Sequence, residues 1–311
     1  MISFQVDDVS NTTRLDKFLC QKFDISFGTA QKLIREKKIK VNNKRVDSSY
    51  KIKTSDQIEI FSDLAKRQEN SSKNSQSKTK ISDKKIKEFL SLVIFEDDHL
   101  LAINKPSGLA TQGGSGIKIS VDDILSAINF TNKLGQKLQL VHRLDKDTSG
   151  ILLIAKNSVS AEFLTDAFRN KTIKKVYLAL VCGTPKKSEG VINIPLRKKL
   201  LGKNEKVTPD FEDGKEAITK FSVMKSFGDY SLLELKPITG RTHQLRVHCK
   251  EIGCAILNDV KYGGIAVLRK NICSRLCLHA YEIEIENYFG RQLKIKNDLP
   301  EFLKSCHNFL R

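Results

Sequence analysis

The chain has 311 residues and is 40% hydrophobic, so it is long enough to bury a sizeable core and to form two domains. Its formal net charge of +18 suits a polyanionic partner, either a nucleic acid or an anionic membrane. Because apolar runs such as residues 151–155 are far too short to span a bilayer, we expect a soluble protein that binds nucleic acid and not a membrane protein.

Residues 1–12 are predicted to be an N-terminal tail, and residues 13–61 a small basic module. Apolar residues at helical spacing predict one helix near residues 15–19 and a second near residues 30–38. Short alternating strands on both sides of Asn42-Asn43 predict a tight hairpin turn, and a last strand covers residues 57–61. The cations expected to bind the polyanion lie on the second helix and the hairpin: Lys32, Arg35, Lys37, Lys38, Lys40, Lys44 and Arg45.

This order of helix, basic helix, hairpin and strand resembles an S4 domain, an RNA-binding module. The match rests on the segments Arg14–Leu19, Gln31–Arg35 and Lys40–Lys44. The chain departs from many S4 domains at Lys37-Lys38, where they carry a glycine near the end of the second helix. The resemblance implies RNA as the partner. The alternative is a basic surface that has no specific partner.

Residues 62–87 are rich in Ser, Lys, Asn and Gln, with scattered apolar residues and no aromatic up to residue 87. Such a segment buries too little surface to become ordered, so we expect a flexible basic linker there. It would separate the N-terminal module from a larger domain of residues 88–311.

The larger domain mixes strand and helix patterns. The predicted strands are Leu92–Glu96, Leu100–Asn104, Gly150–Ala155, Lys174–Cys182, Ala217–Phe227, Ser231–Lys236 and Leu276–Ile285. The predicted helices are Ser120–Asn129, Ser158–Arg169, Thr242–Glu251 and Leu299–Phe309. Consecutive strands joined by hairpins predict an α+β fold with a mixed, mainly antiparallel central sheet. No glycine fingerprint follows the first strand, which argues against a dinucleotide-binding fold.

Seven cysteines, an odd number without framework spacing, indicate free thiols in a reducing cytoplasm. Four of them lie close to histidines in the C-terminal part: Cys249, Cys254, Cys273 and Cys277. Their paired spacings differ from the two intervening residues that are usual in zinc knuckles. We therefore expect small core residues and no metal.

The stretch 142–156 sets Asp145 and Asp147 among the cations Arg143, Lys146 and Lys156, and an apolar run follows directly after Gly150. Loops at the rim of a core commonly present catalytic groups. A calcium loop is excluded because its twelfth position, where a bidentate Glu is needed, is Lys156. Asp147 is expected to satisfy backbone donors in the turn. For Asp145, the loop alone leaves two readings open: catalysis and an ion pair with a neighbour such as Arg143.

The same loop resembles the catalytic motif of RluA-type pseudouridine synthases, in which the first Asp is essential. Further segments match that family in order: Asn104–Gly108, Lys174–Val181, Thr239–His248 and Arg275–Ala280. The run Gln112–Gly116 is nearest to the bacterial RluC-like branch, which modifies large-subunit (23S) ribosomal RNA. The resemblance covers nearly the whole chain outside the linker and implies the pseudouridine synthase fold.

By this resemblance Asp145 is the catalytic carboxylate, acting at C1′, at the base, or through elimination to a glycal. Arg241 would pair with Asp145 and lower its pKa, with Arg246 as the alternative. Tyr177 would stack on the base and accept a sugar proton, and Leu278 would pack under the base. Residues expected to bind the substrate are Arg143, Leu278, His243 and Arg246. The isomerisation needs no redox change, so no nicotinamide, ATP or other cofactor is implied, and the enzyme is expected to be a monomer.

The sequence has three rival functional interpretations. A glycoside hydrolase would need a second carboxylate, whereas the matching motifs supply cations, and the chain has no Trp to line a sugar cleft. A non-catalytic, RNA-binding ribosome-assembly factor would not need Asp145, Tyr177 and Arg241 together. A synthase acting on transfer RNA is the remaining alternative.

Overall fold

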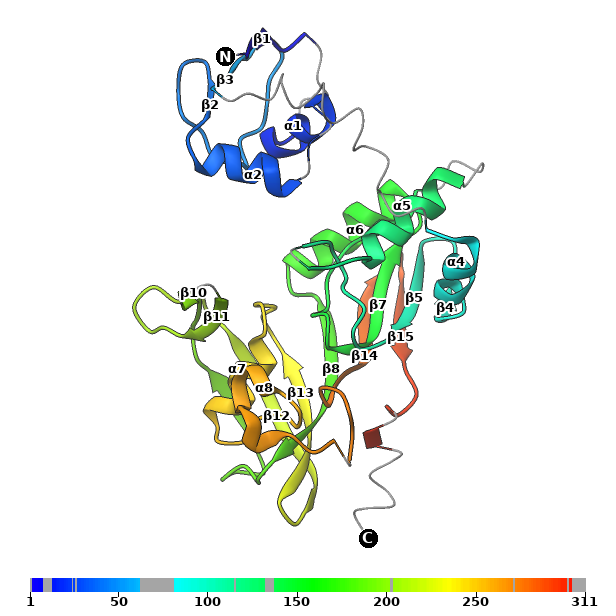
Figure 1. Ribbon diagram of the computed structural model, residues 1–311. Helices are drawn as coiled ribbons and strands as arrows, with labels where there is room; N and C mark the ends of the chain where they lie inside the picture. Colours follow the sequence, from blue (N-terminus) through cyan, green and yellow to red (C-terminus); the bar gives the residue numbers. More distant parts are fainter. Residues whose placement is uncertain are drawn as a thin grey trace. The chain divides into compact units, whose positions relative to one another are not determined.

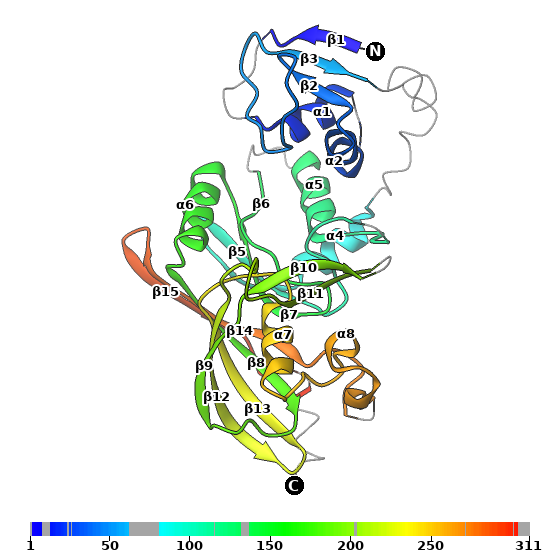
Figure 2. The ribbon, with the colours of Figure 1, turned by 90° about the vertical axis from the view of Figure 1, so that its left-hand side faces the viewer.

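The chain folds into two compact units, Met1–Lys80 and Ile81–Arg311 (Figures 1 and 2). The computed structural model describes every residue except 1, 8–12, 24, 26, 62–80, 115, 132–136, 202–203, 271, 301 and 304–311. Most of the predicted linker, residues 62–87, and most of the predicted helix at residues 299–309 therefore lie outside the described residues.

The first unit has the predicted order of elements. Helices α1 (Leu15–Phe23) and α2 (Phe27–Arg35) precede strands β2 (Ile39–Val41) and β3 (Gln57–Ile60). Asn42 and Asn43 both have positive φ angles, 49° and 60°, as a tight hairpin turn requires. The predicted return strand at residues 44–46 is wrong: only Lys44 bridges back to Val41, and β2 pairs with β3 instead. β2 pairs with β3 because Ile58 and Ile60 of β3 bring buried apolar side chains into the core beside it.

The predicted N-terminal tail is wrong for its first residues. Strand β1 (Ile2–Gln5) pairs antiparallel with β3, giving a sheet in the order β1-β3-β2. Phe4 packs against Phe18 of α1 with ring centroids 6.1 Å apart, and Val6 is buried. Apolar residues at every second position form the buried face of a strand, a pattern already present in Phe4 and Val6. Residues 8–12 of the predicted tail lie outside the described residues.

The predicted linker also ends too late. Helix α4 (Asp83–Leu90) begins inside it, with the side chain of Ser82 accepting a hydrogen bond from the backbone N–H of Lys85. A serine cap, an acidic first turn and one apolar anchor are enough to start a helix next to a folded domain. Phe89 is that anchor and is 3% exposed.

The second unit is built on a ten-stranded sheet in the order β4-β5-β7-β14-β8-β13-β12-β9, with β6 also pairing β7 and β15 also pairing β14. Its strands are β4 (Val93–Glu96), β5 (Leu100–Lys105), β6 (Gln139–Leu140), β7 (Ser149–Ala155), β8 (Ile173–Cys182), β9 (Glu189–Asn193), β12 (Ile218–Phe227), β13 (Tyr230–Pro237), β14 (Leu278–Tyr288) and β15 (Arg291–Lys296). All seven predicted strands are present. A separate hairpin of β10 (Leu196–Leu201) and β11 (Asn204–Pro209) was not predicted, nor were β6, β9 and β15.

Helices cover both faces of β7. Ile151 and Leu153 pack with Leu164 of α6 (Ser158–Arg169), whereas Leu152 and Ile154 pack with α5 (Val121–Thr131). A strand buried on both faces reads as the unbroken apolar run seen in the sequence. Helices α7 (Gln244–Glu251) and α8 (Val260–Gly263) lie beside the β12–β13 part of the sheet in both views (Figures 1 and 2).

One pair of strands joins two antiparallel parts of this sheet. β7 and β14 run parallel over His279–Ser149 and Ala280–Gly150, while the other strand pairs of the described residues are antiparallel. Gly150 has φ +109°, and a Cβ there would lie 2.1 Å from the carbonyl oxygen of Ala280. Only glycine permits that approach. The predicted mixed, mainly antiparallel sheet is confirmed.

Three of the four cysteines considered as zinc ligands are core residues, as expected: Cys249, Cys254 and Cys277 are at most 2% exposed and share one apolar cluster. In the described part of the chain, no helix has the length and apolar composition that a bilayer crossing requires.

Candidate active site

The loop that carries Asp145 connects β6 to β7 and is held by the segment 105–111. The hydroxyl of Thr111 donates to the carbonyl oxygen of Leu144 at 2.7 Å. The carbonyl oxygen of Lys146 accepts from the ammonium of Lys105 at 3.2 Å and from the N–H of Gly108 at 2.8 Å. The matched Asn104–Gly108 turn therefore clamps the backbone of this loop.

Lys105 is fully buried, and its ammonium also donates to the carbonyl oxygens of Pro106 and Leu109. Burial lowers the pKa of Lys105 to about 8, against the attraction of Asp147 and Asp145. The matched motif singled out Lys105 and its turn, but not this clamping contact, because the contact joins segments about 40 residues apart.

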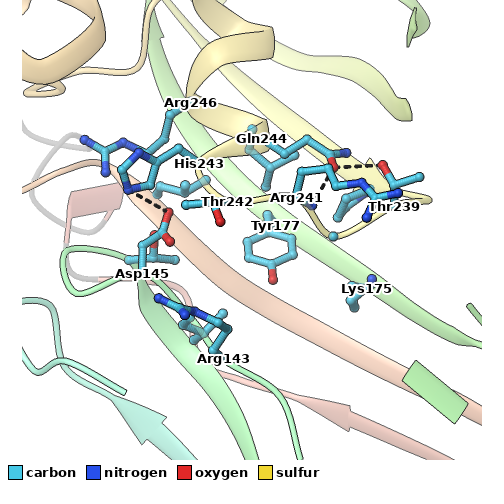
Figure 3. A pocket seen from close by; sticks show the side chains of 16 residues that line it. Arg143, Asp145, Lys175, Tyr177, Thr239, Arg241, Thr242, His243, Gln244 and Arg246 are labelled. Carbon is cyan, nitrogen blue, oxygen red and sulfur yellow. Dashed lines mark hydrogen bonds and ion pairs between the residues drawn. The ribbon is translucent and has the colours of Figure 1, made fainter. Parts of the chain in front are cut away.

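A pocket of about 120 Å³ opens beside Asp145 (Figure 3). It brings together all seven residues predicted for catalysis or substrate binding: Arg143, Asp145, Tyr177, Arg241, His243, Arg246 and Leu278. They come from the loop before β7, from β8, from the segment around the start of α7, and from β14. The pocket thus lies across the parallel junction of the sheet, with Asp145 contributed from the β7 side.

The predicted pairing of Arg241 with Asp145 is wrong. The Nε of Arg241 donates to the carbonyl oxygen of Glu216 at 2.9 Å, and the side chain is exposed. In Figure 3, Arg246 and His243 lie on the Asp145 side of Tyr177, and Arg241 lies on the other side. Arg246 is also the cation that most strongly lowers the pKa of Asp145. The structure therefore favours Arg246, the alternative.

Arg246 is 5% exposed and is held by Asp259, which is 1% exposed. Nε and one terminal nitrogen of Arg246 donate to the two carboxylate oxygens of Asp259 at 2.8 and 2.6 Å. Such a two-point contact fixes the guanidinium plane. Asp259 was missed in the sequence, because nothing in the segment around it distinguishes it from an ordinary turn residue.

Asp145 is partly buried, and this burial raises the pKa of its carboxyl above the ordinary value. Arg246, Arg143 and Lys105 lower the pKa but do not cancel the effect of burial. The expectation of a net lowered pKa is therefore wrong. Burial makes a carboxylate more basic than one in solution, and here the neighbouring cations offset only part of that increase.

His243 stands between Asp145 and a tyrosine. Its Nε2 lies 3.9 Å from Oδ2 of Asp145, and its Nδ1 lies 2.6 Å from the hydroxyl of Tyr262. Burial, followed by the charge of Arg246, lowers the pKa of His243 to about 4, so the ring is neutral at pH 7. Its backbone is left-handed, with φ 52°, at the N cap of α7. Left-handed non-glycine residues are strained and are often found at functional sites.

Tyr177 and Leu278 supply the apolar part of the pocket. Leu278 is 2% exposed, and Tyr177 packs against two separate clusters of buried apolar residues. Burial and the charge of Asp145 raise the pKa of Tyr177, so the ring faces the pocket as a neutral phenol. Its expected second role, as acceptor of a sugar proton, stays a prediction.

The loop that carries Asp145 begins just after β6, at His142. The Nε2 of this partly buried ring accepts a hydrogen bond from the backbone N–H of Leu153 at 2.8 Å, and the ring stacks on Phe168. The imidazole thus continues the hydrogen bonding along β7 beyond the point where the backbone of β6 turns away. Burial lowers the pKa of His142 to about 3. Burial also lowers the pKa values of His243 and His279, each to about 4.

The contribution of these histidines to stability is therefore expected to fall on mild acidification. These rings stay neutral in the folded protein, whereas in the unfolded chain they take up protons below pH 6.5. Their contribution is complete above that pH and is lost as the pH falls toward their folded pKa values. For His142 alone the loss between pH 7.5 and pH 5 is about 2 kcal/mol. Urea unfolding at both pH values measures it, and His142→Gln should flatten the dependence by that amount. An unchanged slope would contradict this account.

The cations predicted to bind RNA lie on the first unit. Lys32 and Lys38 both pair with Glu36, at 3.7 and 2.8 Å. Arg35, Lys37 and Arg45 line a shallow depression, and no ion pair of theirs occurs among the described residues. Lys40 lies over the ring of Phe61, and Lys44 is exposed. The charges available to phosphates are therefore concentrated around the end of α2.

Comparisons with known proteins agree with this geometry. The family model for RNA pseudouridylate synthase matches residues 99–251, and that for the S4 domain matches residues 13–58. The ribosomal large subunit pseudouridine synthase C of Rickettsia typhi is 39% identical over 293 residues, covering 92% of this chain and 94% of that protein. The protein of the same name from Vibrio vulnificus is 38% identical, covering 98% and 95%.

A solved structure is similar as well. Human RNA pseudouridylate synthase domain containing 4 superimposes with a TM-score of 0.60 at 27% identity, covering 71% of this chain and 94% of the human one. The likeness in fold thus extends over more than two thirds of this chain.

Proposed function

The chain belongs to the RNA pseudouridylate synthase family and is an enzyme that converts uridine in RNA to pseudouridine; we propose that its substrate is large-subunit ribosomal RNA and that Asp145 is the catalytic carboxylate. The substrate proposal rests on relatives whose names specify the large ribosomal subunit and on the S4 domain. The observation that carries the site proposal is the convergence of Asp145, Tyr177 and Arg246 on one pocket.

The reaction is an isomerisation. The bond between C1′ and N1 breaks, uracil turns, and C1′ joins C5, while C5 loses a proton and N1 ends with one. Asp145 acts at C1′, at the base or by elimination to a glycal, and each route needs an ionised carboxylate beside the nucleoside. Arg246 and Arg143 favour that ionised form. C1′ cannot be reached inside a stacked helix, so the uridine must be flipped out or unpaired.

The detached uracil has to be retained while it turns. Tyr177 and Leu278 offer a ring face and an apolar contact that fit a pyrimidine, and both line the pocket. We assign Arg143 and His243 to substrate binding at the Asp145 side and Arg241 to the opposite rim, where its exposed guanidinium suits a phosphate. The expected enzyme is a cytoplasmic monomer.

The substrate is tested by incubating the purified protein with transcripts of large-subunit ribosomal RNA and with transfer RNA, and by mapping pseudouridine in both. Modification of the ribosomal RNA alone supports the proposal. Modification of transfer RNA alone would replace it with the alternative substrate. Product in neither RNA would argue against both and leave the RNA-binding assembly role.

Deleting residues 1–61 is expected to weaken binding to long ribosomal RNA by at least about tenfold and to reduce its salt dependence. The rate on a short stem-loop at saturating concentration should be unchanged, because the pocket lies wholly in the second unit. Electrophoretic mobility shifts over a salt series and single-turnover rates measure the two effects.

A matched pair of full-length variants controls for the deletion. Replacing Arg35, Lys37 and Arg45 by alanine should reproduce most of the binding loss. Replacing Lys32 and Lys38, which already pair with Glu36, should cost less. Equal affinity with and without the first unit would refute its role in RNA binding.

A further inference from the structure

Tyr262 connects several parts of the catalytic site without lining it. This residue of α8 is 6% exposed and is absent from the pocket wall. Its hydroxyl lies 2.6 Å from Nδ1 of His243 and accepts the backbone N–H of Val207, on β11, at 3.3 Å. The guanidinium of Arg246 lies 5.2 Å from its ring centre. The imidazole of His243 and the guanidinium of Arg246, both beside Asp145, therefore contact the same tyrosine.

The direction of the hydrogen bonds follows from the charges around His243. A neutral imidazole has one N–H and one acceptor nitrogen. If Nδ1 carried the hydrogen, the lone pair of Nε2 would face the carboxylate of Asp145, which is unfavourable. If the hydroxyl of Tyr262 donates to Nδ1, the hydrogen lies on Nε2 and points toward Asp145. The second arrangement also leaves the tyrosine oxygen free to accept from Val207.

We propose that Tyr262 is a positioning residue for catalysis: its hydroxyl selects the His243 tautomer whose Nε2–H is directed at Asp145. The proposal rests on Asp145 being the catalytic carboxylate. Tyr262 does not touch the nucleoside. It acts through His243, and it supports the guanidinium of Arg246 with its ring.

Two further observations support this assignment. The backbone of His243 is left-handed, so the ring is held against a conformational cost and needs a fixed partner. Burial raises the pKa of Tyr262 and lowers that of His243, which keeps the phenol a donor and the imidazole neutral. A neutral ring contributes direction toward the carboxylate without adding a charge that would repel Arg246.

The direct test is the tautomer of His243, read from the ¹⁵N chemical shifts of its ring in the full-length enzyme. The wild type should show Nδ1 as acceptor and Nε2 protonated. Tyr262→Phe keeps the ring under Arg246 but removes the donor, so the two tautomers should become mixed. Tyr230→Phe is the matched control, since its hydroxyl accepts a hydrogen bond from Arg269 away from the pocket. A wild-type tautomer that is already protonated on Nδ1 would overturn the proposal.

Single-turnover kinetics supply the second test. Tyr262→Phe should lower the maximal rate by about tenfold, the loss of one oriented hydrogen bond, with RNA affinity within about twofold. His243→Gln should lower it similarly, and the double variant should be hardly slower than either, because the two residues act in series. Should Tyr262→Phe unfold, His243→Gln and the wild-type ring shifts still test the relay.

Failure of this inference is distinct from failure of the proposed site. If Asp145→Asn is inactive while Tyr262→Phe retains the full rate and the wild-type tautomer, only the role of Tyr262 is wrong. If the effects of Tyr262→Phe and His243→Gln multiply, Tyr262 does not act through His243. If Asp145→Asn remains active, the proposed site itself is wrong.

Discussion

Asp145→Asn is expected to lower the rate of pseudouridine formation by on the order of 10⁴-fold or more, because no other side chain in the pocket can replace a carboxylate beside the nucleoside. The amide is nearly the same size, so RNA affinity should stay within about threefold. Single-turnover assays with labelled RNA and binding titrations measure the two quantities.

The same variant is expected to be more stable than the wild type. Burial raises the pKa of Asp145, so the folded protein binds a proton more readily than the unfolded chain. Stability is therefore lost as the pH rises from the unfolded value through the raised pKa, and at neutral pH the ionised side chain costs free energy. Asn removes that cost. A higher melting temperature together with lost activity would identify Asp145 as a residue kept for function at the expense of stability.

Asp147→Asn is the control for this experiment. The side chain of Asp147 is exposed, and its backbone carbonyl, which the substitution retains, accepts the hydroxyl of Ser107 at 2.7 Å. Its rate should stay within about tenfold of the wild type. Product formation by Asp145→Asn at a comparable rate would show that the chemistry lies elsewhere.

The two arginines of the Thr239–His248 segment should behave very differently. Arg246→Gln is expected to cost about 10³-fold in rate, since Asp145 loses the cation that most strongly favours its ionised form. The acid limb of the pH–rate profile should move to higher pH by about one unit, because the carboxyl of Asp145 is harder to ionise without this cation. Arg241→Gln should cost less than about tenfold and leave the profile in place.

Arg246→Gln also leaves Asp259 buried without its partner, which on its own destabilises a protein by about 3–5 kcal/mol. The double variant with Asp259→Asn removes the unpaired charge. It should recover much of the stability but not the rate, which separates folding from catalysis. If Arg241→Gln proved the more damaging change, with a shifted acid limb, the pairing inferred from the structure would be wrong.

Local signals account for the elements that the sequence predicted well. Helix α6 spans the predicted residues Ser158–Arg169, because Asn157 caps it and its apolar positions are regularly spaced. The missed hairpin of β10 and β11 lacks regular alternation of apolar residues; among its side chains of described burial, Leu196 and Val207 are buried. Without alternation, only pairing between the two strands reveals it, and pairing is not visible in composition.

The site shows the same division. One motif identified the loop of Asp145, and a second, Thr239–His248, offered two arginines five residues apart as its partner. Their roles depend on where α7 starts, and the side chain of Gln244 decides this by accepting the N–H of Arg241 at 2.9 Å. Arg241 thus precedes the helix, whereas Arg246 lies within it and meets Asp259. Tyr262 and Asp259 were missed because their partners are distant in sequence, and proximity in the fold is what gives them a role.

The close contact of Gly150 with Ala280 has a consequence for how the enzyme grips its substrate. Asp145 lies on the β7 side of this junction, and Tyr177 and Leu278 lie on the other side, so the pocket proposed to admit a nucleoside is lined by residues from two parts of the sheet. Its width is set by the alignment of β7 with β14, where a slip of one residue would displace one wall by about 3.3 Å. The width of the pocket thus depends on a backbone contact outside the pocket. At that position, Gly150, even the methyl group of an alanine would push β7 and β14 apart.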